Sequence, residues 1–137
     1  MSSTVGYSGR PLAAKLGIVA GSRVCALAAP TAYRALLAPV PEGVTFAPAV
    51  SRQTDVKHLF ATERAQLAAA LSALRTDIRS DSAVWVSWPK KSSKVTTDIT
   101  EDAIRAVALP LGFVDVKVCA VSEVWSGLKL VIRKELR

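Results

Sequence analysis

The sequence has few of the residues that build metal sites, disulfides and membrane spans. Its 137 residues include one histidine and two cysteines, Cys25 and Cys119, which lie far apart in apolar stretches. Chelating spacings are absent, so no metal site is predicted, and we expect two buried free thiols. No apolar run approaches the ~18–20 residues that a membrane span needs. Because residues 1–10 also lack the apolar stretch of a signal peptide, we expect a cytoplasmic protein without a membrane partner.

The sequence also lacks the common catalytic motifs. It contains no P-loop, no Gly-x-Ser-x-Gly nucleophile elbow and no paired-carboxylate signature. The only histidine, His58, shares a face of its predicted strand with Val56 and Phe60, which favours a packed side chain over a catalytic base. No catalytic residue is therefore predicted, and the sequence leaves open whether the protein is an enzyme.

Positive charge dominates, especially early in the chain. The formal net charge is +7, and no acidic residue precedes Glu42, whereas four basic residues do. Hydrophobic residues make up 50% of the chain and charged residues only 21%, which excludes a disordered chain. The excess of positive charge favours anionic partners, either a small ligand or, as an alternative, a nucleic acid.

Strand-like and helix-like segments alternate along the chain. We expect strands at residues 23–29, 44–46, 55–61, 83–88, 113–124 and 128–134. We expect helices at residues 11–16, 31–38, 63–78 and 98–109. Pro48 indicates that the short second strand lies near a sheet edge.

Two local patterns give finer expectations. Asp98 and Glu101 have the spacing of a capping box, which predicts that the last helix begins at Asp98. Ser126 and Gly127 separate the last two strands, which predicts a tight turn there and an antiparallel hairpin. In the closing strand, Leu128 and its apolar neighbours at every second position are expected to face inward.

Strands that alternate with helices are typical of a parallel sheet with helices on both faces. We therefore predict an α/β fold, a Rossmann-like three-layer αβα sandwich. Its sheet has about six strands, mostly parallel, and ends in the antiparallel hairpin. Residues 11–137 form a single domain, preceded by a flexible arm of residues 1–10.

Residues 15–30, KLGIVAGSRVCALAAP, resemble the helix–turn–strand entry of class I S-adenosylmethionine-dependent methyltransferases. A closer resemblance covers almost the whole chain and is carried by residues 6–18, 84–102 and 109–135, which include WVSWPKK and DVKVCAVSEVWSGLKLV. It is to an uncharacterised bacterial family, a domain of unknown function (DUF3052-type). This resemblance implies a small Rossmann-like domain without an assigned activity.

The chain departs from the methyltransferases after its first strand. Those enzymes have an acidic residue and a Gly-x-Gly-type turn there, which lets the backbone approach the cofactor. Here the strand runs into Ala28, Ala29, Pro30 and Thr31, and the second strand does not end in an acid. No cofactor is therefore predicted, and S-adenosylmethionine remains the alternative that the resemblance implies.

Ligands of open parallel sheets bind at the carboxyl ends of the strands. This rule selects residues 28–31, 60–62 and 87–94, and the third segment combines a tryptophan with lysines and hydroxyl groups suited to a phosphate or carboxylate. The alternative is a solvated basic loop beside packed tryptophans. The candidate ligand-binding residues are Trp88, Lys90, Lys91, Ser92, Ser93, Lys94 and Thr97.

The leading functional hypothesis is a non-enzymatic ligand-binding or protein-interaction module on a degenerate methyltransferase-like fold. One alternative is an S-adenosylmethionine-binding, methyltransferase-like protein with an atypical cofactor loop. Another is a basic nucleic-acid-associated protein, in which the lysines of residues 90–94 contact phosphates. A homodimer is also open, because the short strand near Val44 leaves a sheet edge available.

Overall fold

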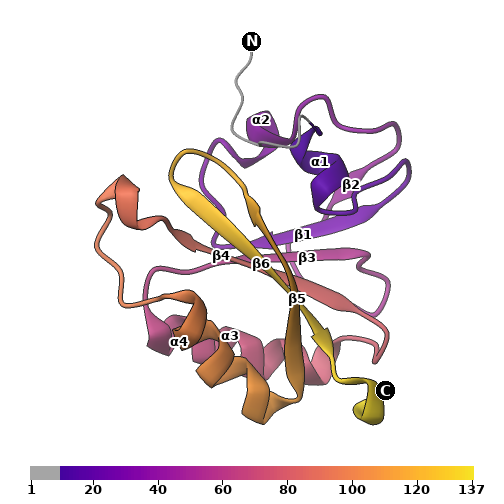
Figure 1. The fold of residues 1–137 in the computed structure, drawn as a ribbon. Helices are drawn as coiled ribbons and strands as arrows, with labels where there is room; N and C mark the ends of the chain where they lie inside the picture. Colours follow the sequence, from indigo (N-terminus) through magenta and orange to yellow (C-terminus); the bar gives the residue numbers. More distant parts are fainter. Residues whose placement is uncertain (1–9) are drawn as a thin grey trace.

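The computed structural model describes residues 10–137, so the predicted arm lies, apart from Arg10, outside the described residues. Within this part of the chain, six strands form one sheet, and helices lie on both of its faces (Figure 1). The strands are β1 (Arg23–Leu27), β2 (Thr45–Phe46), β3 (Val56–Phe60), β4 (Ala83–Pro89), β5 (Phe113–Ala120) and β6 (Trp125–Ile132). The α-helices are α1 (Leu12–Lys15), α2 (Tyr33–Leu37), α3 (Arg64–Asp77) and α4 (Glu101–Ala108). Short 3-10 turns are η1 (Lys91–Ser93), η2 (Leu109–Leu111) and η3 (Lys134–Leu136).

The predicted three-layer α/β fold is confirmed. Figure 1 shows α1 and α2 on one face of the sheet and α3 and α4 on the other. Leu67, Leu71 and Leu74 of α3 pack with β4 and β6 in one buried cluster, whereas Tyr33 and Leu37 of α2 pack with β1 and β3 in the other. Each face of the sheet therefore has its own hydrophobic core.

The strand order β2-β1-β3-β4-β6-β5 places the carboxyl ends of four strands on one edge. β1 is parallel to both of its neighbours, and β4 is parallel to β3. After β1 the chain passes to α2 on one face, and after β3 it passes to α3 on the opposite face. The direction of connection thus reverses between β1 and β3, which is where open α/β sheets form ligand crevices.

The sequence pattern placed several strand residues correctly. β2 is an edge strand, as Pro48 predicted, and Leu128, Leu130 and Ile132 are completely buried. His58 lies on the α2 face of β3 and stacks on Phe60 at a centroid distance of 4.3 Å. The expectation of a packed histidine is confirmed.

The predicted hairpin turn at Ser126 and Gly127 is wrong. Both residues pair with β5 and β4 inside β6, and the turn is formed by residues 121–124. There the Ser122 hydroxyl accepts hydrogen bonds from the backbone N–H groups of Val124 and Trp125. Gly127 serves packing instead, since a Cβ at this position would lie 3.0 Å from Val121 and 3.5 Å from Trp85. Its lack of a side chain makes room on the sheet and does not mark a turn.

The predicted capping box is also wrong. The N-cap of α4 is Thr100, whose hydroxyl accepts from the backbone N–H of Ala103. Asp98 instead accepts a 2.7 Å hydrogen bond from the backbone N–H of Arg64 at the start of α3. Asp98 therefore ties the loop before α4 to the neighbouring helix, a contact that its spacing in the sequence does not reveal.

Candidate ligand-binding site

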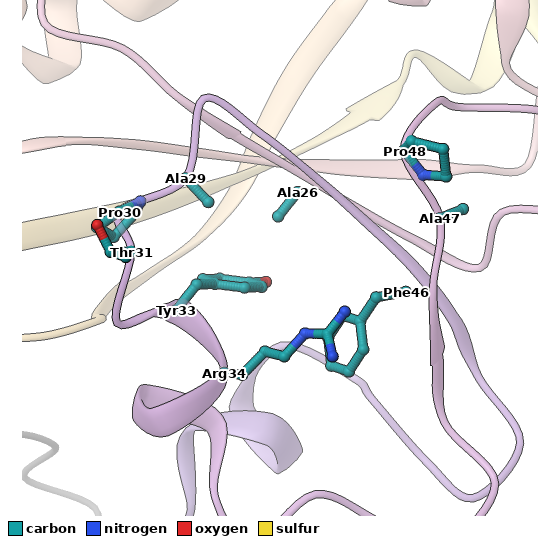
Figure 2. Close-up of a pocket in the computed structure, with 9 residues that line it drawn as sticks. All are labelled: Ala26, Ala29, Pro30, Thr31, Tyr33, Arg34, Phe46, Ala47 and Pro48. Atoms are coloured by element: carbon teal, nitrogen blue, oxygen red, sulfur yellow. The ribbon is translucent and has the colours of Figure 1, made fainter.

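A pocket of about 430 Å³ opens at the carboxyl ends of β1 and β2 (Figure 2). Its wall consists of Ala26 on β1, residues 29–31 in the following loop, Tyr33 and Arg34 on α2, and residues 46–48 at the end of β2. This volume lies within the range of small-molecule sites. The sequence rule that pointed to the carboxyl ends of the strands selected residues 29–31, which form one side of the pocket.

Arg34 has the only charged side chain among the described residues of this wall. Its guanidinium lies over the Phe46 ring, 4.3 Å from the centroid (Figure 2). Such a cation–π contact holds the planar group in place without using its N–H donors. Within residues 10–137 Arg34 has no side-chain hydrogen bond or ion pair, so its donors remain available to a ligand.

Behind the pocket wall, a buried hydrogen-bonded series links α2, β3 and β4. The Tyr33 hydroxyl lies 2.9 Å from Nδ1 of His58, and Nε2 of His58 lies 2.7 Å from the Ser87 hydroxyl. His58 and Ser87 have no exposed surface, and Tyr33 is 5% exposed. Burial lowers the pKa of His58 to about 3, so its imidazole is neutral at physiological pH. Burial also raises the pKa of Tyr33, which keeps its phenol protonated.

The Ser87–His58 pair does not form a catalytic nucleophile. Neither side chain reaches the surface, so no substrate can contact the Ser87 hydroxyl. Nucleophilic catalysis requires both an accessible hydroxyl and a base that takes up a proton near neutral pH, and His58 is held neutral. The series is part of the support for Tyr33 rather than a reaction centre.

The backbone at the pocket entrance corrects the predicted end of β1. The strand stops at Leu27, two residues before the expected end at Ala29, because Ala28 has a φ of +57°. This left-handed conformation costs a non-glycine residue about 1–2 kcal/mol. The glycine turn of methyltransferases is thus missing in sequence, but the chain still makes a left-handed turn directly after its first strand.

A second hollow of about 520 Å³ lies between the start of α3 and the loop before α4. It is lined by Thr62, Glu63, Ala65 and residues 96–98. Its polar groups bond mainly to one another: the Thr97 hydroxyl donates to the carbonyl oxygen of Thr62 at 2.6 Å, and Asp98 accepts from the backbone of α3. The acidic side chains here disfavour an anion.

The lysines of the predicted site lie in the loop after β4. Lys91 and Lys94 are exposed and Lys90 is half-buried, and none of them lines either hollow. The backbone N–H of Lys90 donates to the carbonyl oxygen of Val124, which anchors the loop to the β5–β6 turn. The loop therefore presents positive charge on the surface, and its role as an anion site remains a prediction.

The other predicted site residues are distributed between core and loop. Trp88 is 7% exposed and packs in the core beneath α3 and α4. Ser92 is exposed, whereas the Ser93 hydroxyl donates to the carbonyl oxygen of Lys90 within the loop. Of the predicted residues, Thr97 alone lines one of the two hollows described above.

Sequence analysis missed Arg34, Phe46 and Tyr33 as candidate site residues. They come from two elements separated by a proline-rich segment, and no motif links them. The available signals were indirect: Tyr33 and Arg34 follow closely on a strand end, and Phe46 ends the next strand. Only the parallel pairing of β1 with β2 brings the two ends together.

Several kinds of site are absent from the described residues. No group of three or more His, Cys, Asp or Glu side chains in residues 10–137 is placed to hold a metal ion. Cys25 is buried and Cys119 is half-buried, both as free thiols whose pKa values burial raises. No helix in this part of the chain is long and apolar enough to cross a membrane.

Several solved structures have a similar fold at low sequence identity. One, from Sulfolobus solfataricus and assigned to the type 11 methyltransferases, has a TM-score of 0.61 at 10% identity and covers 96% of this chain and 95% of its own. The fibrillarin pre-rRNA processing protein of Methanococcus jannaschii has a TM-score of 0.52 at 13% identity, covering 84% and 68%. LepI, solved in complex with S-adenosylmethionine, has a TM-score of 0.51 at 13% identity, covering 97% and 49%.

These similarities establish the Rossmann-like, methyltransferase-like fold. Because the sequence identities are low, the similarities establish the fold alone. No protein-family model matches the sequence, and no curated protein matches it. The resemblance to class I methyltransferases is therefore confirmed as a fold. The closer resemblance to the bacterial family of unknown function stays a prediction.

Proposed function

We propose that this protein is a small-molecule-binding module that holds its ligand between β1, α2 and β2 and does not transfer methyl groups itself. The observation that carries the proposal is the pocket at the carboxyl ends of β1 and β2, where the Arg34 donors have no hydrogen-bond partner within residues 10–137. The pocket lies beside the point where the strand connections reverse, which favours ligand binding in this class of sheet.

The chemistry of the lining supports binding without catalysis. Among the described residues that line the pocket, none has a carboxylate, cysteine or histidine side chain. The chemically versatile groups nearby are enclosed: His58 and Cys25 are completely buried. A general base or nucleophile must reach its substrate to act, so the pocket suits recognition better than reaction.

A second candidate is an S-adenosylmethionine-binding protein with an atypical cofactor loop. The fold favours it, and so does the left-handed turn at Ala28 directly after β1. The lining side chains fit this cofactor poorly. Arg34 suits its carboxylate, but no anionic side chain among the described lining residues offsets its cationic ammonium and sulfonium groups. A carboxylate for its ribose is missing as well.

Isothermal calorimetry with S-adenosylmethionine, S-adenosylhomocysteine, adenosine and adenosine monophosphate tests the proposal. The variant Ala47→Trp fills this pocket and is expected to abolish binding. The matched variant Ala65→Trp fills the second hollow and is expected to leave binding unchanged. Saturable binding that only Ala65→Trp removes would move the site to the second hollow. Methyl transfer from labelled S-adenosylmethionine would contradict the non-enzymatic role.

A further inference from the structure

The buried series Ser87–His58–Tyr33 has a direction that the positions of its heavy atoms imply. A neutral imidazole carries one hydrogen, so one ring nitrogen donates and the other accepts. Within residues 10–137, the Ser87 hydroxyl has His58 as its only hydrogen-bond partner, and the Tyr33 hydroxyl has only His58 as well. Two arrangements of hydrogens satisfy the distances, and they differ in which hydroxyl hydrogen is left without an acceptor.

In the first arrangement, Tyr33 donates to Nδ1 and Nε2 donates to Ser87. The Ser87 hydrogen then has no acceptor, although this hydroxyl has no exposed surface. Leaving a buried donor unsatisfied is costly, because the group loses its water without gaining a partner. The first arrangement is therefore disfavoured.

In the second arrangement, Ser87 donates to Nε2 and the Nδ1 hydrogen is donated to the Tyr33 oxygen. The hydrogens of Ser87 and His58 then both have acceptors, and only the Tyr33 hydroxyl hydrogen remains without one. Tyr33 lines the pocket, and Figure 2 shows its hydroxyl end directed into the ring of lining residues. The free hydrogen is thus available at the pocket, where a ligand can accept it.

Arg34 adds the second donor at the same place. Its guanidinium is fixed over Phe46, and its N–H groups have no partner in the described part of the chain. None of the lining residues in the described part of the chain is acidic. The wall thus combines a cation and a hydroxyl donor without an opposing charge, while the alanine and proline side chains around them are apolar.

We propose that the pocket binds a small ligand bearing a carboxylate or phosphate, which accepts hydrogen bonds from Arg34 and from Tyr33, whose hydrogen is directed into the pocket by Ser87 and His58. The inference rests on the proposed function and names the ligand class of the same pocket. A guanidinium presents its donors in a fork that matches carboxylate and phosphate oxygens. Opposite charge then attracts the ligand, and the hydroxyl orients it.

The direction of the series can be measured without any ligand. The chain has one histidine, so a long-range ¹H–¹⁵N correlation spectrum contains a single imidazole. We expect the hydrogen on Nδ1, which the ¹⁵N shifts of the two ring nitrogens distinguish from a hydrogen on Nε2. A hydrogen on Nε2 would overturn the assignment of Tyr33 as a donor to the pocket.

The ligand class is tested by calorimetry with two matched pairs of probes, benzoate with benzamide and adenosine monophosphate with adenosine. Within a pair that binds, the anion is expected to bind more tightly than its neutral partner, and the two pairs distinguish carboxylate from phosphate. Arg34→Gln should weaken the anion roughly tenfold or more. Tyr33→Phe should weaken it to a smaller extent. Lys134→Gln, which removes an exposed positive charge outside both the pocket and the predicted loop site, should change the affinity little.

The outcomes separate this inference from the proposed function. Saturable binding that Ala47→Trp removes, but that is equally tight for neutral probes and insensitive to Arg34→Gln, would overturn the ligand class and leave the binding module intact. Equal losses in Arg34→Gln and Lys134→Gln would also overturn it, because attraction would then come from the net charge. Absence of binding by every probe would overturn both proposals.

Discussion

Removing the titratable group at His58 should make the stability of the protein less sensitive to acid. The imidazole is completely buried between Tyr33, Phe60 and Ser87, and none of these neighbours is an anion that would stabilise its charged form. Burial lowers its pKa from 6.5 to about 3. Between these two values the unfolded chain binds a proton that the folded chain does not bind.

The sign and size follow from proton linkage. Where the unfolded state binds more protons, stability rises with pH, so it falls as the pH is lowered from about 6.5 toward 3. Each pH unit well inside this window corresponds to about 1.36 kcal/mol. Between pH 6 and pH 4 the histidine should therefore remove about 2.5 kcal/mol from the free energy of unfolding.

Urea unfolding of the wild type and of His58→Gln, followed by tryptophan fluorescence at both pH values, measures the effect. Carboxylates titrate in both proteins, so the difference between the two acid-induced losses isolates the histidine. The glutamine variant is expected to be less stable at pH 6 but to lose about 2.5 kcal/mol less on acidification. Equal losses would show that His58 is not held neutral in the fold. The assignment of hydrogens in the Ser87–His58–Tyr33 series would then be wrong.

Three further predictions concern other strained or charged positions. Ala28→Gly should leave stability unchanged or raise it by up to about 1 kcal/mol in thermal unfolding, because glycine accepts the φ of +57° without strain; a clear loss would contradict the left-handed turn. Lys57→Met should stabilise the protein by roughly 1–3 kcal/mol at pH 7. The Lys57 side chain is 1% exposed with one hydrogen bond, to the carbonyl oxygen of Thr54, and burial together with Arg79 lowers its pKa to about 8; a destabilised variant would show that the ammonium has better partners. If the exposed loop binds nucleic acid, Lys90→Ala with Lys91→Ala should weaken salt-sensitive retention on heparin, and unchanged retention would exclude that loop.

The local pattern of the sequence was sufficient for the layout of the fold. Alternating apolar strands and helix-like segments predicted the three layers, because each element must bury its apolar side against the sheet. Pro48 predicted the edge position of β2, since proline cannot donate to a strand on its far side. The burial of Leu128 and His58 followed from the two-residue period of a strand.

Local pattern failed where a residue serves a distant partner. Gly127 is a residue typical of turns, but it pairs with β4 and β5 inside β6, where a Cβ would lie only 3.0 Å from Val121. Asp98 has the spacing of an N-cap, yet it accepts from the backbone of α3, and Thr100 caps α4. The role of each residue is set by its pairing or hydrogen bonding with another element, which local spacing does not reveal.

The candidate site also depends on contacts between elements that local sequence patterns do not reveal. The sequence alone determined that residues typical of catalytic and metal sites are few, with one histidine, two separated cysteines and no catalytic motif. It also determined the excess of positive charge. Tertiary structure decided what the remaining groups do. Parallel pairing of β1 with β2 brought Phe46 to Arg34, and the packing of α2 on β3 placed Tyr33 on His58. A hydrogen bond or a pocket depends on distances across the sheet, and these exist only once the chain has folded.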